Sequence, residues 1–365
     1  YRTHFYGTDS SYSEKSVRQV YRTYDALVYF KNAQPNKANI DIKQTLNFNY
    51  LQETFGKAHE WFIAGQTDFQ KTFKQYHSII ASFNFDISDL KNDSLTLQRN
   101  LFTPMVGYGF NNDDWKAWGK FGVTIDGKTP VFVTDVHIEK RLYEHAIIAY
   151  LEYNRRDKKN SLESLAQVNP YIQHSLQIKN SPTGDFGAGF KGTAQNLSYN
   201  LAFHLFQVKN MPFFINDSTD AKRFVSVYDN NTLVYNFHFE AGYNVKEWLR
   251  FLVMGDYNYY HLHTQAQPWY QPAFTGVFRA NYIWKNKISA TLDVYGLTNS
   301  NALLPEGQVR KIKGTADINL GFEYFFSRHV SFFATLNNIA NIKYQSWYHY
   351  PTYGINGMVG GKFSF

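Results

Sequence analysis

Apolar and polar residues alternate with a period of two along most of the chain, the pattern of β-strands that have two different faces. Residues 311–324 show it clearly. One face there carries Lys311, Lys313, Thr315, Asp317 and Asn319, and the other carries Ile312, Gly314, Ala316, Ile318, Leu320, Phe322 and Tyr324. The same alternation recurs over residues 40–50, 115–124, 233–244 and 274–284. The pattern predicts an all-β fold whose sheet has one polar and one apolar face.

The alternating segments are too long for an ordinary soluble domain. Soluble strands average about 5–6 residues, whereas strands that cross a bilayer need about 9–11. Charged residues such as Asp256, Asp293 and Asp317 stand in the middle of the polar face. A hydrated lumen tolerates such charges, but lipid does not. We therefore predict a closed, transmembrane antiparallel β-barrel.

Short and long connections alternate between the predicted strands. Long connections are expected over residues 88–100, 155–184, 211–232, 261–271, 297–308 and 340–353, with short turns between them. Short periplasmic turns and long extracellular loops are typical of outer-membrane barrels. With the C-terminus in the periplasm, about 16–18 strands are predicted in a single domain over residues 1–365. The eighteen segments are 1–7, 19–31, 38–51, 58–71, 77–87, 102–111, 114–125, 130–138, 142–155, 184–195, 197–210, 233–245, 247–261, 270–285, 287–297, 309–326, 329–339 and 354–365.

Composition agrees with this class and excludes others. Aromatic residues make up 18% of the 365 residues, and such residues favour strands and membrane interfaces. No apolar run approaches the roughly 18 residues of a spanning helix. The chain has 0 cysteines, which excludes disulfides, thiolate zinc sites and cysteine nucleophiles. The formal charge of +7 comes without a long basic cluster, so we expect no nucleic-acid partner.

The last residues resemble the C-terminal β-signal of bacterial outer-membrane proteins. The signal is carried by Gly360, Phe363 and the terminal Phe365. The resemblance implies that the barrel-assembly machinery is a partner during biogenesis. It also implies the outer membrane as the location, with the lipid bilayer and lipopolysaccharide as surroundings. An aromatic last residue would anchor the closing strand at the periplasmic interface.

A more specific resemblance covers residues 336–354. Leu336-Asn337-Asn338-Ile339-Ala340-Asn341-Ile342-Lys343-Tyr344, followed by Trp347, Tyr350-Pro351 and Gly354, is similar to the end of TonB-dependent receptor barrels, above all those of Bacteroidota. Such receptors carry an N-terminal plug and a TonB box, and this sequence shows neither. Either these parts lie outside the chain or the protein belongs with plug-less barrels. Because residues 1–7 already read as the end of a strand, we expect N-terminal strands or a plug to be missing from this chain.

No constellation of residues points to catalysis, so an enzyme is not expected. His137 with Glu139, and His261 with His263, each share a strand face, yet neither pair has a third metal ligand at a readable spacing. A Gly-x-Ser-x-Gly nucleophile motif is absent. The polar run 216–220 reads as a solvated loop rather than a calcium site. We expect no metal and no cofactor.

Two functions remain open. The first is a channel or porin-like transporter for small hydrophilic solutes, because barrels of this size enclose an aqueous lumen. Its lumen-facing candidates are Lys311, Lys313, Asp317, Arg279, Asp293 and Glu240. The second is a non-conducting structural or interaction subunit of a larger outer-membrane complex with other outer-membrane proteins or surface lipoproteins. Its contacts would come from an aromatic extracellular loop with Tyr344, Trp347, Tyr348 and Tyr350, which could instead pack over the barrel rim.

Overall fold

The computed structural model describes residues 2–4, 13, 18–33, 37–54, 57–92, 96–127, 130–173, 178–220 and 222–365. One antiparallel sheet dominates these residues. Its strands are β1 (Arg2–His4), β2 (Gln19–Lys31), β3 (Ile40–Glu53), β4 (His59–Phe73), β5 (His77–Lys91), β6 (Thr96–Asn111), β7 (Trp115–Thr124), β8 (Val131–Tyr143), β9 (Ile147–Lys158), β10 (Ser181–Ala194), β11 (Leu197–Asn216), β12 (Phe224–Lys246), β13 (Leu249–His261), β14 (Phe274–Trp284), β15 (Ile288–Leu297), β18 (Thr315–Phe325), β19 (Val330–Asn337) and β22 (Asn356–Phe363).

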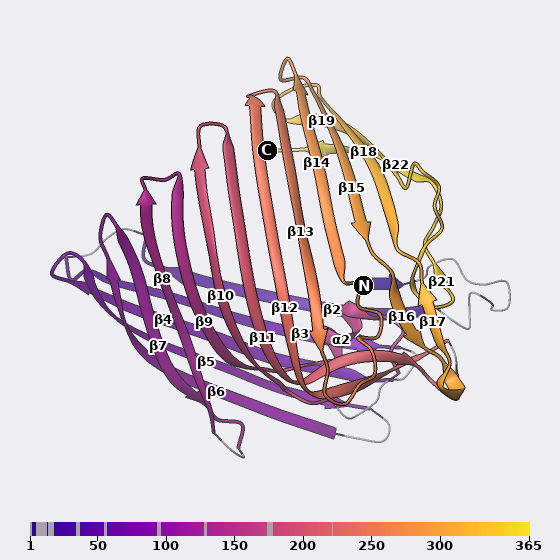
Figure 1. Ribbon diagram of the computed structural model, residues 1–365, viewed down its shortest axis with the longest axis horizontal. Coiled ribbons are helices and arrows are strands. Elements are labelled where there is room, and N and C mark those ends of the chain that lie inside the picture. Colours follow the sequence, from indigo (N-terminus) through magenta and orange to yellow (C-terminus); the bar gives the residue numbers. More distant parts are fainter. Residues whose placement is uncertain are drawn as a thin grey trace.

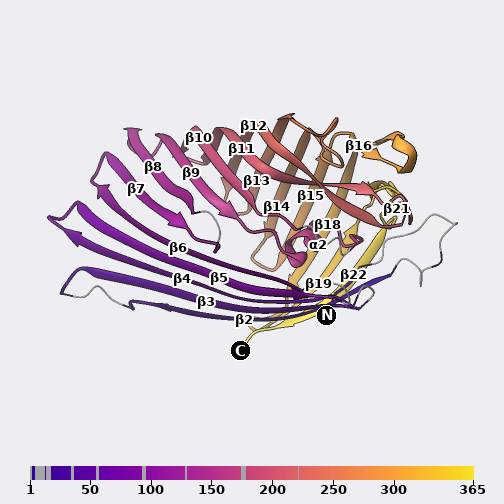
Figure 2. The same ribbon diagram turned by 90° about the horizontal axis from the view of Figure 1, so that it is seen from below.

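The sheet is a meander. Every strand pairs antiparallel with its neighbours along the chain, from β1 through β15 and on through β18 and β19 to β22. The strands are tilted, and the sheet curls round an interior (Figures 1 and 2). The predicted all-β transmembrane barrel of about 16–18 strands is confirmed, because each of the eighteen predicted segments overlaps a strand of this sheet, although residues 1 and 5–7 lie outside the described residues.

Several predicted connections proved to be strand. The predicted loop 211–232 is mostly paired backbone, because β11 and β12 remain in register up to Asn216 and Phe224. The alternation is lost there because both faces are covered: the consecutive Phe213 and Phe214 are 0% and 2% exposed. The predicted loop 88–100 shortens in the same way, since β5 and β6 pair out to Lys91 and Thr96.

The predicted strand 309–326 is wrong as a single element. It divides into β17 (Val309–Ile312), which pairs with β16 (Ser300–Leu303) outside the main sheet, and β18. The break lies at Gly314, where a Cβ would stand 2.4 Å from the carbonyl oxygen of Leu297. The remaining small elements all lie in connections: α2 (Leu162–Val168), η1 (Pro305–Gly307), β20 (Gln345–Trp347) and β21 (Tyr350–Pro351). Among the described residues, no helix is both long enough and apolar enough to span a bilayer.

The two faces of the sheet differ as the alternation predicts. Apolar side chains on the outer face stay uncovered by the rest of the chain, and Leu201 is 52% exposed. Leu201 stands in one row with Phe190 and Phe239, midway along the strands between the exposed Tyr243 and the rings of Tyr235 and Tyr259. Such a band, bordered by aromatic residues, is the lipid-facing surface of a membrane barrel.

A lysine in this band should destabilise the barrel. Leu201→Lys is expected to lower the free energy of unfolding by about 2–4 kcal/mol, the usual cost of a cation near the middle of the bilayer. Glu240→Lys, whose position on β12 pairs with Asn200 on the opposite face, is the control and should change it by less than about 1 kcal/mol. Urea unfolding in lipid vesicles measures both variants. Equal destabilisation by the two would contradict this assignment of the faces.

Candidate functional site

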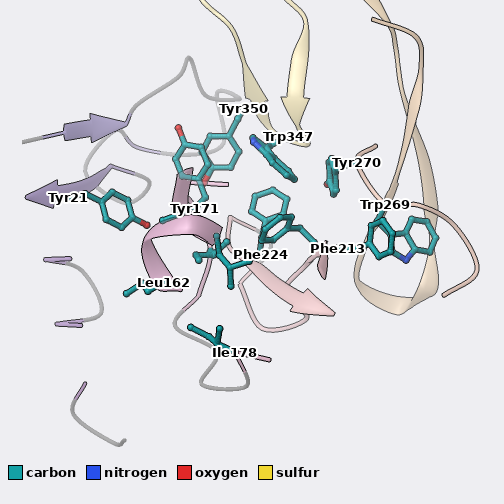
Figure 3. Close-up of a cluster of buried hydrophobic side chains, with 14 of the residues drawn as sticks. Tyr21, Leu162, Tyr171, Ile178, Phe213, Phe224, Trp269, Tyr270, Trp347 and Tyr350 are labelled. Atoms are coloured by element: carbon teal, nitrogen blue, oxygen red, sulfur yellow. The ribbon is translucent and has the colours of Figure 1, made fainter. Parts of the chain in front are cut away.

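A buried hydrophobic cluster, here called the cap core, lies where the long connections meet (Figure 3). Its members come from segments far apart in the sequence: the strands β2, β3, β5, β11 and β12, and the connections after β3, β9, β13, β15 and β19. The central members are Tyr21, Leu162, Leu165, Tyr171, Ile172, Phe213, Phe214, Phe224, Trp269, Tyr270, Ile312, Trp347 and Tyr350. Because the long connections are extracellular in barrels of this type, we assign the cap core to the extracellular end.

The connection after β9 supplies the centre of the cap core. Its helix α2 begins at Ser161, whose hydroxyl accepts from the Ser164 backbone N–H while the Ser164 hydroxyl accepts from that of Ser161. This reciprocal capping fixes a helix of only 7 residues that would not be stable alone. Leu162 and Leu165 point into the cluster and are 2% and 4% exposed. The helix lies inside the curve of the sheet (Figure 2).

One side of this connection is bonded to the first strands. The Tyr21 hydroxyl of β2 donates to the Pro170 carbonyl oxygen at 2.7 Å. The Glu163 backbone N–H donates to Glu60 Oε2 of β4 at 3.1 Å, and Asn49 of β3 donates to Glu163 Oε1 at 3.3 Å. These bonds attach α2 and the residues after it to β2, β3 and β4.

The other side is bonded to strands much later in the sequence. Tyr171 stacks on Tyr350 with ring centroids 3.7 Å apart, and the Phe224 backbone N–H donates to the Tyr171 carbonyl oxygen at 3.1 Å. The Phe224 ring in turn contacts Trp347 and Tyr270 at centroid distances of 5.3 and 5.6 Å. The connection therefore bridges the wall at β2–β4 to β12 and to the connection after β19, and the cap core spans the extracellular mouth.

Polar groups secure the rim of the cap core. Tyr270 donates its hydroxyl hydrogen to Asn216 Oδ1, and burial raises the pKa of this phenol. Asp229, in the part of β12 beyond the aromatic band, accepts from the backbone N–H groups of His263, Thr264 and Gln265. Burial alone would raise the pKa of Asp229, but these N–H groups and the Thr232 hydroxyl outweigh it and hold that pKa well below its usual range.

A polar row crosses the inner face of the sheet below the cap core. Backbone register aligns Trp118, His137 and Glu152 on β7–β9. Trp118 stacks on His137 at 4.2 Å, and His137 contacts Glu152 at 3.2 Å and Glu139 at 2.7 Å. Further along the same face, His238 contacts Asp256 at 3.0 Å. Imidazole and carboxylate groups thus line the interior between β7 and β13.

The sequence candidates for the lumen separate into two groups. Arg279 and Asp293 face each other on β14 and β15 and form a two-point ion pair at 2.5 and 3.2 Å. Asp317 on β18 accepts from the Tyr344 hydroxyl at 3.2 Å, and Glu240 lies on β12. Lys311 and Lys313, by contrast, lie in β17 and just after it, outside the main sheet, because the strand predicted there is broken.

The aromatic loop residues are partly inside the cap core. Trp347 and Tyr350 are only 7% and 2% exposed, whereas Tyr348 packs against the edge of the cluster. This is the arrangement in which the loop packs over the barrel rim. At the chain end, Gly360 and Phe363 lie on β22 and Phe365 follows it. A Cβ at Gly360 would stand 2.5 Å from the Phe333 ring, so glycine lets the last two strands pack closely.

Sequence reasoning missed the cap core because its members come from segments far apart in the sequence. One signal was present in the Asn169-Pro170-Tyr171 turn, where Asn169 Oδ1 accepts from the Tyr171 N–H. The run 216–220 is a local turn: Asp217 Oδ1 accepts from the N–H groups of Thr219 and Asp220. The His263 backbone N–H donates to Asp229 Oδ1 at 3.0 Å.

Sequence comparisons identify no relatives: no protein-family model matches the chain, and no curated protein is similar to it in sequence. Solved structures are similar in fold. The ferric enterobactin receptor of Pseudomonas aeruginosa superimposes with a TM-score of 0.70 at 11% identity, over 95% of this chain and 62% of that one. The FrpB iron transporter of Neisseria meningitidis gives 0.73 at 10% identity, over 96% and 64%. The copper transporter OprC gives 0.70 at 10% identity, over 95% and 66%.

These likenesses establish the fold. The chain has the fold of an outer-membrane β-barrel and resembles the barrels of TonB-dependent receptors. It spans less than two thirds of the length of each of these structures.

The lowered pKa of Asp229 predicts how the free energy of unfolding depends on pH. A folded pKa below the unfolded value of about 3.9 stabilises the protein at neutral pH, and this stabilisation is lost as the pH falls below about 4. Asp229→Asn, which weakens the bonds to residues 263–265, should cost about 1.5–3 kcal/mol at pH 7. Only the wild type loses the stabilisation by the ionised carboxylate in acid. The difference in free energy of unfolding between wild type and variant should therefore narrow by about 1 kcal/mol at pH 3.

Urea unfolding in detergent at the two pH values gives these free energies. Asp113→Asn, in the exposed short turn between β6 and β7, is the control and should match the wild type at both. If the difference in free energy of unfolding between wild type and Asp229→Asn were the same at pH 7 and pH 3, the ionised Asp229 carboxylate would not stabilise the rim of the cap core.

Proposed function

We propose that this chain forms a transport barrel of the bacterial outer membrane, in which small hydrophilic solutes pass through a lumen gated by the cap core. The proposal rests on one observation: the inner face of the sheet is polar, and the cap core lies across its extracellular end. Charged and amide side chains line the interior between β7 and β15, while α2 and its aromatic partners close over the extracellular end. A polar interior in a barrel of this size suits a hydrated path for solutes.

The solved structures that are similar in fold support a transport role by analogy. The proteins that superimpose on the chain are described as a receptor for ferric enterobactin and as iron and copper transporters. Ionic groups of both signs line the lumen, as in the pairs Arg279–Asp293 and Lys120–Asp135. We therefore propose hydrophilic solutes without a strong preference for one sign of charge. The Bacteroidota-like ending and the β-signal further support assembly by the barrel-assembly machinery.

A second function is favoured by one observation. The cap core spans the mouth with a well-packed aromatic cluster in which Tyr171 and Phe224 are 0% exposed. A permanently closed cap would suit a non-conducting subunit of a larger outer-membrane complex, with the cap and the nearby aromatic loop as the surface for lipoprotein partners. A plug-less barrel, one of the two alternatives that the resemblance to TonB-dependent receptors leaves open, is compatible with either function.

Conductance separates these alternatives. In planar bilayers the wild-type protein should show rare, low-conductance openings, and Phe224→Ala should open several-fold more often because it removes a buried ring that packs against both Tyr270 and Trp347. Phe237→Ala removes the same side chain from the lipid-facing side of the same strand, where Phe237 is 53% exposed, and should behave as wild type.

Two results would count against the proposed gate. Openings that are frequent in the wild type and unchanged in Phe224→Ala would remove the gating role of the cap core. Silence of every variant, although each is folded by circular dichroism, would favour the non-conducting subunit.

A further inference from the structure

A glycine in the polar row creates a gap between an acid and a histidine. Backbone register places Glu152 of β9, Gly187 of β10 and His204 of β11 side by side. Successive side chains alternate between faces, so Asp185 shares the inner face with position 187. The neighbouring Leu151 and Phe186 are 50% and 44% exposed on the opposite, lipid-facing side. Three potential ligands from three adjacent strands thus face the lumen around one glycine.

The gap depends on the missing side chain. A Cβ built on Gly187 would stand 2.8 Å from Glu152 Cγ and 2.8 Å from His204 Cε1. Real Cβ atoms do not approach other atoms so closely, so any other residue would push the acid and the histidine apart. Glycine here therefore lets the side chains on either side converge over the backbone of β10.

The distances suit a shared cation. His204 Nδ1 lies 3.0 Å from Asp185 Oδ1 and 3.9 Å from Glu152 Oε1, and one ligand atom from each residue falls within 4.8 Å of the others. Ligands about 2.0–2.2 Å from a tetrahedral zinc ion stand roughly 3.3–3.6 Å apart. Sub-ångström shifts of the three side chains would bring them to that spacing. Among the described residues, this is the one group of three or more acidic or histidine side chains with such geometry.

The charge of the group also calls for a cation. In the described part of the chain, the ion-pair partners of Glu152 and Asp185 are histidines alone, namely His137 and His204. The nearby Lys191 is directed to Glu139 instead, at 2.5 Å. An imidazole that ligates a metal ion is neutral, so the loaded site would combine it with two carboxylates, whose charge of about −2 a divalent cation cancels. His137, held by Glu139 on its other nitrogen at 2.7 Å, would orient Glu152 from behind, as groups around metal ligands commonly do.

We propose that Glu152, Asp185 and His204 bind a first-row divalent cation, represented by Zn²⁺, on the lumenal wall. An imidazole together with two carboxylates favours zinc and its neighbours over calcium and magnesium, which take oxygen ligands alone. The side chains of the three residues are 32%, 23% and 16% exposed, so an ion in the lumen can reach them. The inference does not require the pore to conduct.

Zn²⁺ titration of the purified full chain in detergent, after removal of chelators, tests the site. The wild type should bind one Zn²⁺ ion with micromolar or tighter affinity, measured by calorimetry and by competition with a chromophoric chelator. His204→Gln and Gly187→Ala should each weaken binding at least tenfold, the first by removing the imidazole and the second by filling the gap. Gly184→Ala on the same strand is the control, because its Cβ would meet only the Tyr153 hydroxyl at 3.6 Å, and it should bind as wild type.

Circular dichroism and heat-modifiable migration in gels establish that each variant is folded, so loss of binding cannot be confused with loss of the barrel. Replacing Zn²⁺ with Co²⁺ adds a readout, since visible absorption of the bound ion should disappear in Gly187→Ala. Absence of a bound ion in the wild type would overturn the proposal. Binding that survives unchanged in both His204→Gln and Gly187→Ala would also overturn it, by placing the ion elsewhere.

Discussion

A strand in a bilayer must satisfy its backbone groups with neighbouring strands, because the hydrocarbon offers no hydrogen-bond partners. The main sheet meets this constraint with an unbroken antiparallel ladder in which each strand pairs with the next. The pleat then assigns every second side chain to lipid and the rest to the lumen. The exposed Leu201 and the polar Glu240 therefore follow from one pattern, and so do the polar row and the lipid-facing band.

The cap core obeys a different constraint. Its segments lie beyond the aromatic band, where water competes for backbone hydrogen bonds, so they need a hydrophobic cluster and local caps to keep a fixed shape. Tyr171 stacked on Tyr350 and Phe224 packed on Trp347 supply the cluster. Ser161 and Asp229 supply the caps. The extracellular connections consequently form an ordered structure across the mouth of the barrel. The transport function proposed for the lumen depends on whether that structure moves.

The sequence predicted the barrel well because its signal is local. Period-two alternation, strand length and the placement of short turns each act within about ten residues, and every predicted segment overlaps a strand of the main sheet. The errors lie where long-range packing overrides that signal. Phe213 and Phe214 are buried on both faces, so their strand lacked alternation, and Gly314 interrupts a strand whose alternation was continuous.

The sites were harder to predict for a related reason. His137 and Glu139 were visible as a pair on one strand, but their partner Glu152 comes from the next strand and His204 from two strands beyond that. Only the register aligns them, and register depends on the turns and the pairing of whole strands. The cap core likewise joins residues as distant as Tyr21 and Pro170, which no local pattern connects.

Hydrogen–deuterium exchange of the cap core tests most directly whether the extracellular connections form a fixed structure across the mouth. The N–H groups of Leu165, Asn169 and Phe224 are bonded to Ser161, Leu165 and Tyr171. They should exchange at least about 100-fold more slowly than free loop amides, because exchange requires the cluster to open. Exchange of these amides as fast as in an unstructured loop would contradict the account, since the barrel mouth would then be open.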